Sequence, residues 1–217
     1  MSLKTLGLSD ELHNYVVAHS APISDLMREL AEETRRLLPA DADMQVAPEQ
    51  ATFLTFLTRM LGARNAVEIG TFTGLSSLAI ATALPDDGKL TCFDVSTEYT
   101  DVARRYWTRA GLDNRIELRI GPARETLPGL PDEPYLDLAF IDADKVGYPA
   151  YWAELVPRMR PGGVIAVDNV LRNGAVLDPR SDADRAIAAF NTQVLADDRV
   201  DVVMLPLADG VTLARRR

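Results

Sequence analysis

The stretch Ala66-Val-Glu-Ile-Gly-Thr-Phe-Thr-Gly74 decides the fold class of this chain of 217 residues. Its apolar start predicts a buried strand, its glycines predict a tight turn, and the residues after Gly74 predict a helix. In a doubly wound α/β sheet, a strand, a glycine-rich turn and a helix in this order form the place where a nucleotide-like cofactor binds. We therefore expect a cofactor at this turn.

Short apolar runs alternate with helical patterns through the rest of the chain. Strands are expected near residues 66–69, 89–93, 115–120, 136–141 and 163–167, and helices near 74–84, 97–110, 147–159 and 181–195. This alternation predicts an α/β fold with a doubly wound, Rossmann-like parallel sheet. The apolar runs 200–205 and 211–214 are separated only by a short turn, too short for a parallel crossover, so they are expected to form an antiparallel hairpin at one edge.

Three helical patterns precede the sheet, at residues 9–19, 24–38 and 48–61. A chain of this length with 47% hydrophobic residues can bury one large core. We expect a single domain over residues 1–217, with a helical N-terminal part and lid (1–62) and an α/β core (63–217). The terminal Arg215-Arg-Arg217 is expected to be a solvated tail.

Composition disfavours several kinds of partner. The chain has 23 basic and 32 acidic residues and a net charge of −9, which would repel a nucleic-acid backbone. The sequence has no apolar run near the ~18 residues of a membrane span and no cleavable leader pattern, so we expect a cytoplasmic protein without a membrane partner. Cys92 lies in an apolar run and is expected to be a buried, inert thiol. His13 and His19 belong to the N-terminal helices, and we assign them no catalytic role.

Two predicted strands end in side chains that carry oxygen. The run 136–141 leads to Asp142, and the run 163–167 leads to Asp168 and Asn169. Because the carboxyl ends of neighbouring parallel strands meet at one edge of a sheet, these oxygens predict a site for a hard cation such as Mg²⁺ or Ca²⁺, with Mn²⁺ as a further option. The alternative is that each side chain caps the next helix. No convenient histidine or cysteine cluster favours zinc.

The glycine-rich turn favours one kind of cofactor. Gly70 and Gly74 lack the close glycine pair that lets the backbone approach a pyrophosphate, so a ligand without phosphates fits better. Asp94 ends the second strand about 26 residues after Glu68, where an acidic residue commonly binds ribose hydroxyls. Ala123 could lie against an adenine, or could follow a plain turn before a short helix. Together these features favour S-adenosylmethionine over a nicotinamide nucleotide, although a glycine at such a turn can serve packing alone.

In these residues the sequence resembles the cation-dependent O-methyltransferase family of the caffeoyl-CoA and catechol type, whose members are class I S-adenosylmethionine enzymes. The resemblance runs from about Met44 to Arg217. Its carriers are Val67-Glu-Ile-Gly-Thr-Phe-Thr-Gly74, Leu84-Pro-Asp-Asp-Gly88, Ala110-Gly111, Phe140-Ile-Asp-Ala-Asp-Lys145 followed by Tyr148, Gly162-Gly-Val-Ile-Ala-Val-Asp-Asn-Val-Leu171 and Leu205-Pro-Leu-Ala-Asp-Gly210.

The resemblance implies a seven-stranded sheet with the last strand antiparallel, a homodimer, and a divalent cation held by Asp142, Asp168 and Asn169. It also implies a set of residues that border the cofactor: Met44, Glu68, Gly70, Phe72, Ser76, Asp94, Ala123 and Asp142. Lys145 matches the lysine that lies near the reacting hydroxyl in the family. Arg172 stands where many relatives carry tryptophan, and Asp144 stands where the animal catechol enzymes carry it, so the acceptor side departs from the family pattern.

The predicted function is divalent-cation-dependent methyl transfer from S-adenosylmethionine to a hydroxyl of a small vicinal-diol, catechol-like aromatic. Lys145 is expected to act as the general base, because a cation at Asp142 would depress the pKa of its ammonium group; the alternative is a solvated loop lysine. Residues 172–180 form a candidate active-site loop. Other functions left open are a transfer RNA hydroxyuridine O-methyltransferase, a nicotinamide-dependent reductase and a non-catalytic S-adenosylmethionine-binding module.

Overall fold

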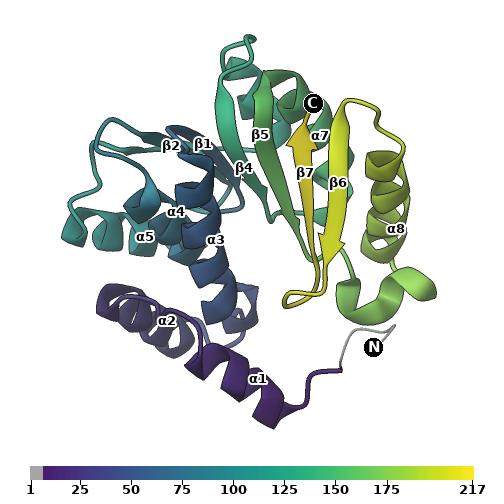
Figure 1. Cartoon of the computed structure of the whole chain (residues 1–217). Helices are drawn as coiled ribbons and strands as arrows, with labels where there is room; N and C mark the ends of the chain where they lie inside the picture. Colours follow the sequence, from purple (N-terminus) through teal and green to yellow (C-terminus); the bar gives the residue numbers. More distant parts are fainter. Residues whose placement is uncertain (1–6) are drawn as a thin grey trace.

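The computed structural model describes residues 7–217, which fold around one seven-stranded sheet (Figure 1). Its strand order is β3-β2-β1-β4-β5-β7-β6. The strands are β1 (Asn65–Ile69), β2 (Lys89–Asp94), β3 (Ile116–Ile120), β4 (Leu136–Ile141), β5 (Met159–Asp168), β6 (Val200–Leu205) and β7 (Val211–Arg216). β7 pairs antiparallel with both β5 and β6, and the strands from β3 to β5 pair in parallel. The predicted fold class is confirmed.

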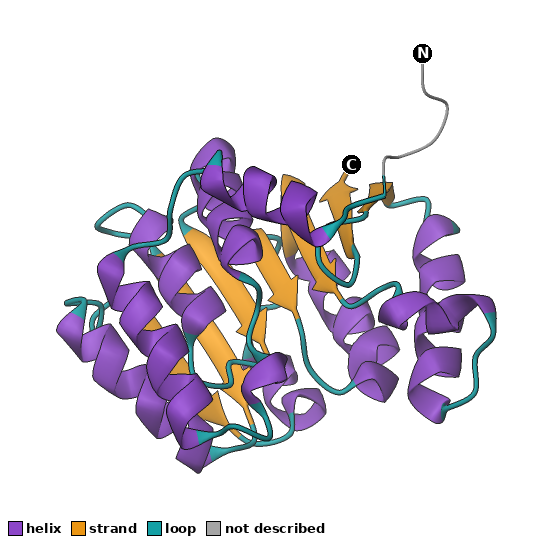
Figure 2. Cartoon of the chain, turned by 90° about the horizontal axis from the view of Figure 1, so that it is seen from below, coloured by secondary structure: helices purple, strands orange, loops and turns teal. Residues whose placement is uncertain are grey.

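Helices cover both faces of the sheet (Figures 1 and 2). The longer ones are α1 (Asp10–Ala18), α2 (Asp25–Leu37), α3 (Pro48–Leu61), α4 (Leu75–Ala83), α5 (Thr97–Arg109), α7 (Tyr148–Arg158) and α8 (Asp182–Leu195). Shorter segments are η1 (Ala42–Met44), α6 (Ala123–Thr126), η2 (Leu127–Gly129), η3 (Lys145–Gly147) and η4 (Arg172–Leu177). Among the helices of residues 7–217, none is long and apolar enough to cross a membrane.

Alternating side chains of β4 join the two apolar layers. Leu138 and Phe140 pack with α2–α5 in one buried cluster, whereas Ala139 and Ile141 pack with α7 and α8 in the other. All six residues of β4 are buried, which explains why the strand reads as a nearly continuous apolar run. β4 therefore runs through the middle of the core and delivers the next residue, Asp142, to the carboxyl edge.

The N-terminal helices are attached to the sheet at its carboxyl edge. Leu30 of α2 and Leu54 of α3 belong to the same buried cluster as α4. Thr34 donates a hydrogen bond to the Thr73 hydroxyl (2.9 Å), and Gln45 donates to the same oxygen (3.1 Å). These contacts bring the segment from η1 to the start of α3 over the glycine-rich turn.

Two boundaries differ from those expected. β5 begins at Met159 instead of near residue 163, because a register shift opposite Leu136 and Leu138 accommodates the Pro161-Gly-Gly163 stretch that reads as a turn. The expected solvated tail was also wrong, since Arg215 and Arg216 pair with β6. The charge of the arginines correctly indicates contact with water. A strand at the surface can expose its side chains to water while its backbone pairs with a neighbouring strand.

Candidate active site

A cavity of about 920 Å³ lies at the carboxyl ends of β1, β2, β4 and β5. η1 and the start of α3 close one side of it, and η4 and the β6–β7 turn close another. Figure 2 views this end of the sheet from below. Ten of the residues predicted to bind cofactor, cation or acceptor line it: Met44, Gly70, Phe72, Ser76, Asp94, Ala123, Asp142, Lys145, Asp168 and Asn169.

The two glycines of the turn have different tasks. Gly70 has φ +89°, and a Cβ atom there would lie 1.9 Å from the backbone oxygen of Asp142. Only glycine allows the ends of β1 and β4 to approach this closely. Gly74 has φ +91°, and a Cβ atom there would lie 2.6 Å from the Cβ of Ala103 on α5. Gly70 therefore shapes the site, whereas Gly74 allows α4 and α5 to pack closely.

Asp94 fixes the shape of the turn. Its Oδ2 accepts hydrogen bonds from the backbone N–H groups of Thr71 (2.9 Å) and Phe72 (2.8 Å), and its Oδ1 accepts one from Ser96 (2.8 Å). Phe72 has φ +50°, so these bonds hold a backbone conformation that side chains disfavour. A carboxylate offers about four acceptor positions, which leaves room for a ribose hydroxyl on the cavity side.

Glu68 is the predicted cofactor residue that does not line the cavity. It is fully buried on β1, and within the described residues neither carboxylate oxygen has a hydrogen-bond partner. Burial raises the pKa of Glu68 to about 8, and the nearby Ser76, Cys92 and Thr71 side chains oppose this only in part. Burial also raises the pKa of the Cys92 thiol, which agrees with an inert cysteine. Glu68 is therefore buried outside the cavity lining, close to Ser76, which does line the cavity.

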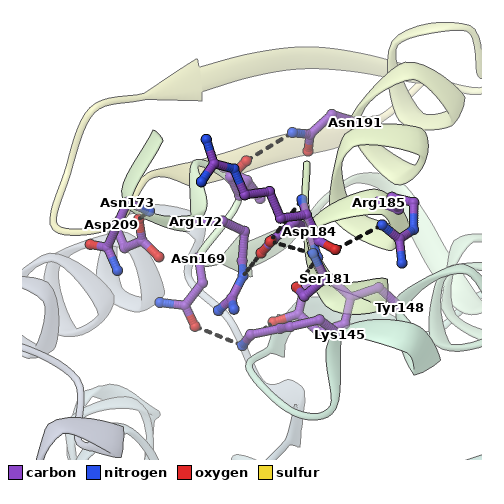
Figure 3. A network of polar contacts seen from close by, with 12 residues as sticks. Lys145, Tyr148, Asn169, Arg172, Asn173, Ser181, Asp184, Arg185, Asn191 and Asp209 are labelled. Carbon is purple, nitrogen blue, oxygen red and sulfur yellow. Dashed lines mark hydrogen bonds and ion pairs between the residues drawn. The ribbon is translucent and has the colours of Figure 1, made fainter. Parts of the chain in front are cut away.

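Lys145 contacts the oxygen-bearing side chains that follow β4 and β5, and Figure 3 shows its contact with Asn169. Its Nζ donates hydrogen bonds to Asn169 Oδ1 (2.6 Å), Asp142 Oδ1 (2.9 Å) and the Tyr148 hydroxyl (2.7 Å). That hydroxyl donates to the backbone oxygen of Asp168 (3.1 Å). Nζ thus contacts three polar side chains at once. Lys145 is a half-buried residue of the site and not a solvated loop lysine.

The donor set fits a hard divalent cation. Asp168 is 3% exposed, and burial together with the negative charge of Asp142 raises its pKa to about 7. Two neighbouring carboxylates and an amide oxygen are the ligands that such cations prefer. Residues 7–217 contain no cluster of three His, Cys, Asp or Glu side chains suited to a metal ion, so the set depends on the amide of Asn169. A cation there would take over contacts that Lys145 now makes.

The cavity also contains residues to which the motifs assigned no role. Gln50 of α3, Tyr151 of α7 and Asp209 of the β6–β7 turn all line the cavity. Tyr151 donates a hydrogen bond to Asp144, which Arg124 also contacts at 3.2 Å. Gln50 is a polar residue on an otherwise apolar helix face, and this signal could have indicated it. The candidate loop forms η4, and its first residues line the cavity. His13 and His19 do not line it.

Comparisons with known proteins agree with this geometry. The O-methyltransferase family model matches residues 17–217. The chain belongs to this family. It is 42% identical to a probable caffeoyl-CoA O-methyltransferase of Dictyostelium discoideum, over 96% of this chain and 93% of that one.

Solved structures of other methyltransferases have the same fold. The SAH-bound methyltransferase PaMTH1 of Podospora anserina has a TM-score of 0.88 and 29% identity, covering 99% of both chains. The O-methyltransferase of Bacillus cereus in complex with SAH has a TM-score of 0.85 and 33% identity, covering 95% of this chain and 97% of that one. The prediction of an S-adenosylmethionine-dependent O-methyltransferase is confirmed.

Proposed function

We propose that this O-methyltransferase moves the methyl group of S-adenosylmethionine to a hydroxyl of a small catechol-like aromatic, with a divalent cation at Asp142, Asp168 and Asn169. One observation carries the proposal: the three oxygen-bearing side chains and Lys145 converge in the cavity that the glycine-rich turn also lines. The name of the Dictyostelium relative, a probable caffeoyl-CoA O-methyltransferase, supports an aromatic acceptor. The net charge of −9 disfavours transfer RNA.

The chemistry requires a phenol to lose its proton. A neutral phenol, with a pKa near 10 as in tyrosine, is a poor nucleophile at neutral pH. A bound divalent cation would supply positive charge that acidifies and orients two adjacent hydroxyls. With the cation bound at Asp142 and Asn169, Lys145 in its neutral amine form would take the proton of the reacting hydroxyl at Nζ, and the Tyr148 hydroxyl would keep that nitrogen in place. The phenolate oxygen then bonds to the methyl carbon while the carbon–sulfur electrons return to sulfur.

Asp94 and the turn that it fixes hold the cofactor. Asp94 would accept hydrogen bonds from the ribose hydroxyls, Ala123 would lie against the adenine, and Gly70, Phe72 and Ser76 would hold the ligand at the turn. Met44 would cover the cofactor from the N-terminal side, since η1 lies on the cavity wall. S-adenosylmethionine bound there would supply the methyl group for transfer to the acceptor.

Removal of the cation tests the proposal. After exhaustive EDTA dialysis, methylation of a catechol should fall by about 100-fold or more, because the acceptor hydroxyl is no longer acidified. Mg²⁺, Ca²⁺ or Mn²⁺ should each be tested for restoration of the rate. Isothermal titration should show Mg²⁺ binding that Asp168→Asn weakens. Undiminished turnover after EDTA would reject the cation, and absence of methyl transfer from any vicinal diol would reject the acceptor class.

We also propose that the protein is a homodimer. Phe56 and Met60, one turn apart on α3, are largely exposed, and Val203 of β6 is about half exposed. Figure 1 shows α3 and the nearer faces of β7 and β6 on one side of the molecule, with no helix drawn over the two strands. Neighbouring exposed apolar side chains such as Phe56 and Met60 are typical of a protein–protein contact, and a second copy of the chain is the partner that the family resemblance favours.

A further inference from the structure

We propose that Arg172 selects an acceptor that carries a carboxylate, so that the substrate class is an anionic catechol. This inference rests on the proposed function and assigns the acceptor end of the same cavity. Of the described residues that line the cavity, only Lys145 and Arg172 have positively charged side chains. Lys145 already has three hydrogen-bond acceptors, whereas Arg172 has donors to spare.

The guanidinium group of Arg172 makes one weak contact. Its Nε lies 3.4 Å from Asp184 Oδ1, and neither terminal nitrogen forms a hydrogen bond within residues 7–217. The side chain is 30% exposed, so these nitrogens are accessible to a ligand. Figure 3 shows Arg172 extending toward the end of the site that holds Asn169 and Lys145. Four N–H donors on a planar group match the two oxygens of a carboxylate.

Asp184 does not need Arg172 as its partner. The Asp184 carboxylate accepts the backbone N–H of Ser181 (3.0 Å), while its own N–H donates to the Ser181 hydroxyl (3.1 Å), which completes a capping box at the start of α8. Hydrogen bonds from Ser181 to the carboxylate are the largest cause of the lowering of the pKa of Asp184 to about 2, and the contact with Arg172 is a smaller cause. The contact therefore orients the arginine at its Nε and leaves the far side of the guanidinium group open.

The backbone turns Arg172 into the cavity at a conformational cost. Arg172 and Asn173 have φ +51° and +50°, a region that residues other than glycine rarely adopt. The β6–β7 turn holds them there, because the Leu171 N–H donates to the Asp209 backbone oxygen (3.0 Å) and the Asn173 N–H donates to the Asp209 carboxylate. Strain that is maintained by a second loop is typical of a functional position.

Charge explains why such a residue is needed. The protein has a net charge of −9, and its cavity is lined by several carboxylates, so an anionic acceptor would be repelled without a local cation. Most of these carboxylates already have hydrogen-bond partners. Asp94 accepts from the glycine-rich turn, Asp144 accepts from Arg124 and Tyr151, and Asp209 accepts from the backbone N–H of Asn173. Arg172 is left to pair with a charge that the ligand brings.

A matched pair of acceptors tests the inference. The kcat/KM values for 3,4-dihydroxycinnamate and for its methyl ester are measured with the cation-loaded enzyme, in the wild type and in Arg172→Met. The wild type should prefer the carboxylate. Arg172→Met should reduce the carboxylate-to-ester ratio at least about tenfold, as expected for a lost charge-assisted hydrogen bond, and the loss for the carboxylate should appear in KM. Arg172→Lys should recover part of the preference.

Arg64→Met is the control, because Arg64 is exposed, contacts Asp87 and does not line the cavity; it should keep the wild-type ratio. Circular dichroism checks that each variant folds. An unchanged ratio in Arg172→Met, or a wild type that turns over both acceptors equally, overturns the inference and leaves the proposed function standing. Turnover of neither acceptor rejects the inference and the proposed function together.

Discussion

Lys145 contacts the residues that follow both β4 and β5, and it is the proposed general base. Lys145→Ala should lower kcat by about 10²–10⁴-fold, the range for loss of a positioned general base, while the Kd for S-adenosylmethionine changes by less than about threefold. Single-turnover kinetics and isothermal titration measure the two effects. Lys89→Ala is the control, since Lys89 is an exposed lysine at the start of β2. Equal losses in turnover and cofactor binding would assign Lys145 a structural task.

Glu68 should give the unliganded protein an unusual dependence of stability on pH. Its pKa is raised from 4.5 to about 8 in the folded chain, so between these pH values the folded state binds more protons than the unfolded state. The free energy of unfolding should therefore fall as pH rises through this window, by up to about 1.4 kcal/mol per pH unit. The pKa of Glu68 is raised because its carboxylate is buried without hydrogen-bond partners within the described residues.

Glu68→Gln removes this ionisation. Urea unfolding at pH 5, 6, 7 and 8 should show the variant becoming progressively more stable relative to the wild type as pH increases. Glu133→Gln, at an exposed loop position, should follow the wild type. A constant difference between Glu68→Gln and the wild type across this range would mean that Glu68 ionises normally in the fold.

At the scale of elements, the β1–α4 turn and the end of β4 form one unit. Gly70→Ala places a Cβ on the Asp142 backbone, so it should lower stability well beyond the cost of a positive φ and also weaken S-adenosylmethionine binding. Gly111→Ala is a matched control, because Gly111 has φ +68° with no atom within 4 Å of the added Cβ.

The control should therefore lose about 1 kcal/mol, the backbone cost alone, and should bind the cofactor normally. Thermal unfolding and cofactor titration of both variants compare the two effects. If Gly70→Ala matched Gly111→Ala in both measurements, the close approach of β1 and β4 would have no consequence for the site.

At the scale of the whole molecule, the exposed apolar pair Phe56 and Met60 on α3 should control assembly. The double variant Phe56→Asp, Met60→Asp places two charges there and should shift the protein toward monomer in sedimentation velocity runs. Leu177→Asp, at another exposed apolar position, should not. A wild type that sediments as a monomer at all concentrations would reject the homodimer.

The N-terminal helices and the sheet share one buried cluster, which is why the interpretation of a single domain is retained. This packing of α2 and α3 also explains how residues 44–50 reach the cavity. The cytoplasmic location stays a prediction.

The sequence alone determined the sheet and most of the site's constituents. Periodic burial produces alternating apolar runs, and the residue after a parallel strand must lie at the carboxyl edge, so Asp142, Asp168 and Asn169 could be placed together from their positions in the chain. The tertiary structure decided what depends on contacts between distant segments. It buried Glu68 outside the cavity lining, extended β7 through Arg216, and turned Arg172 inward against Asp209. Burial depth, strand pairing and positive φ angles are set by neighbours that lie far away in the sequence, which is why local patterns could not supply them.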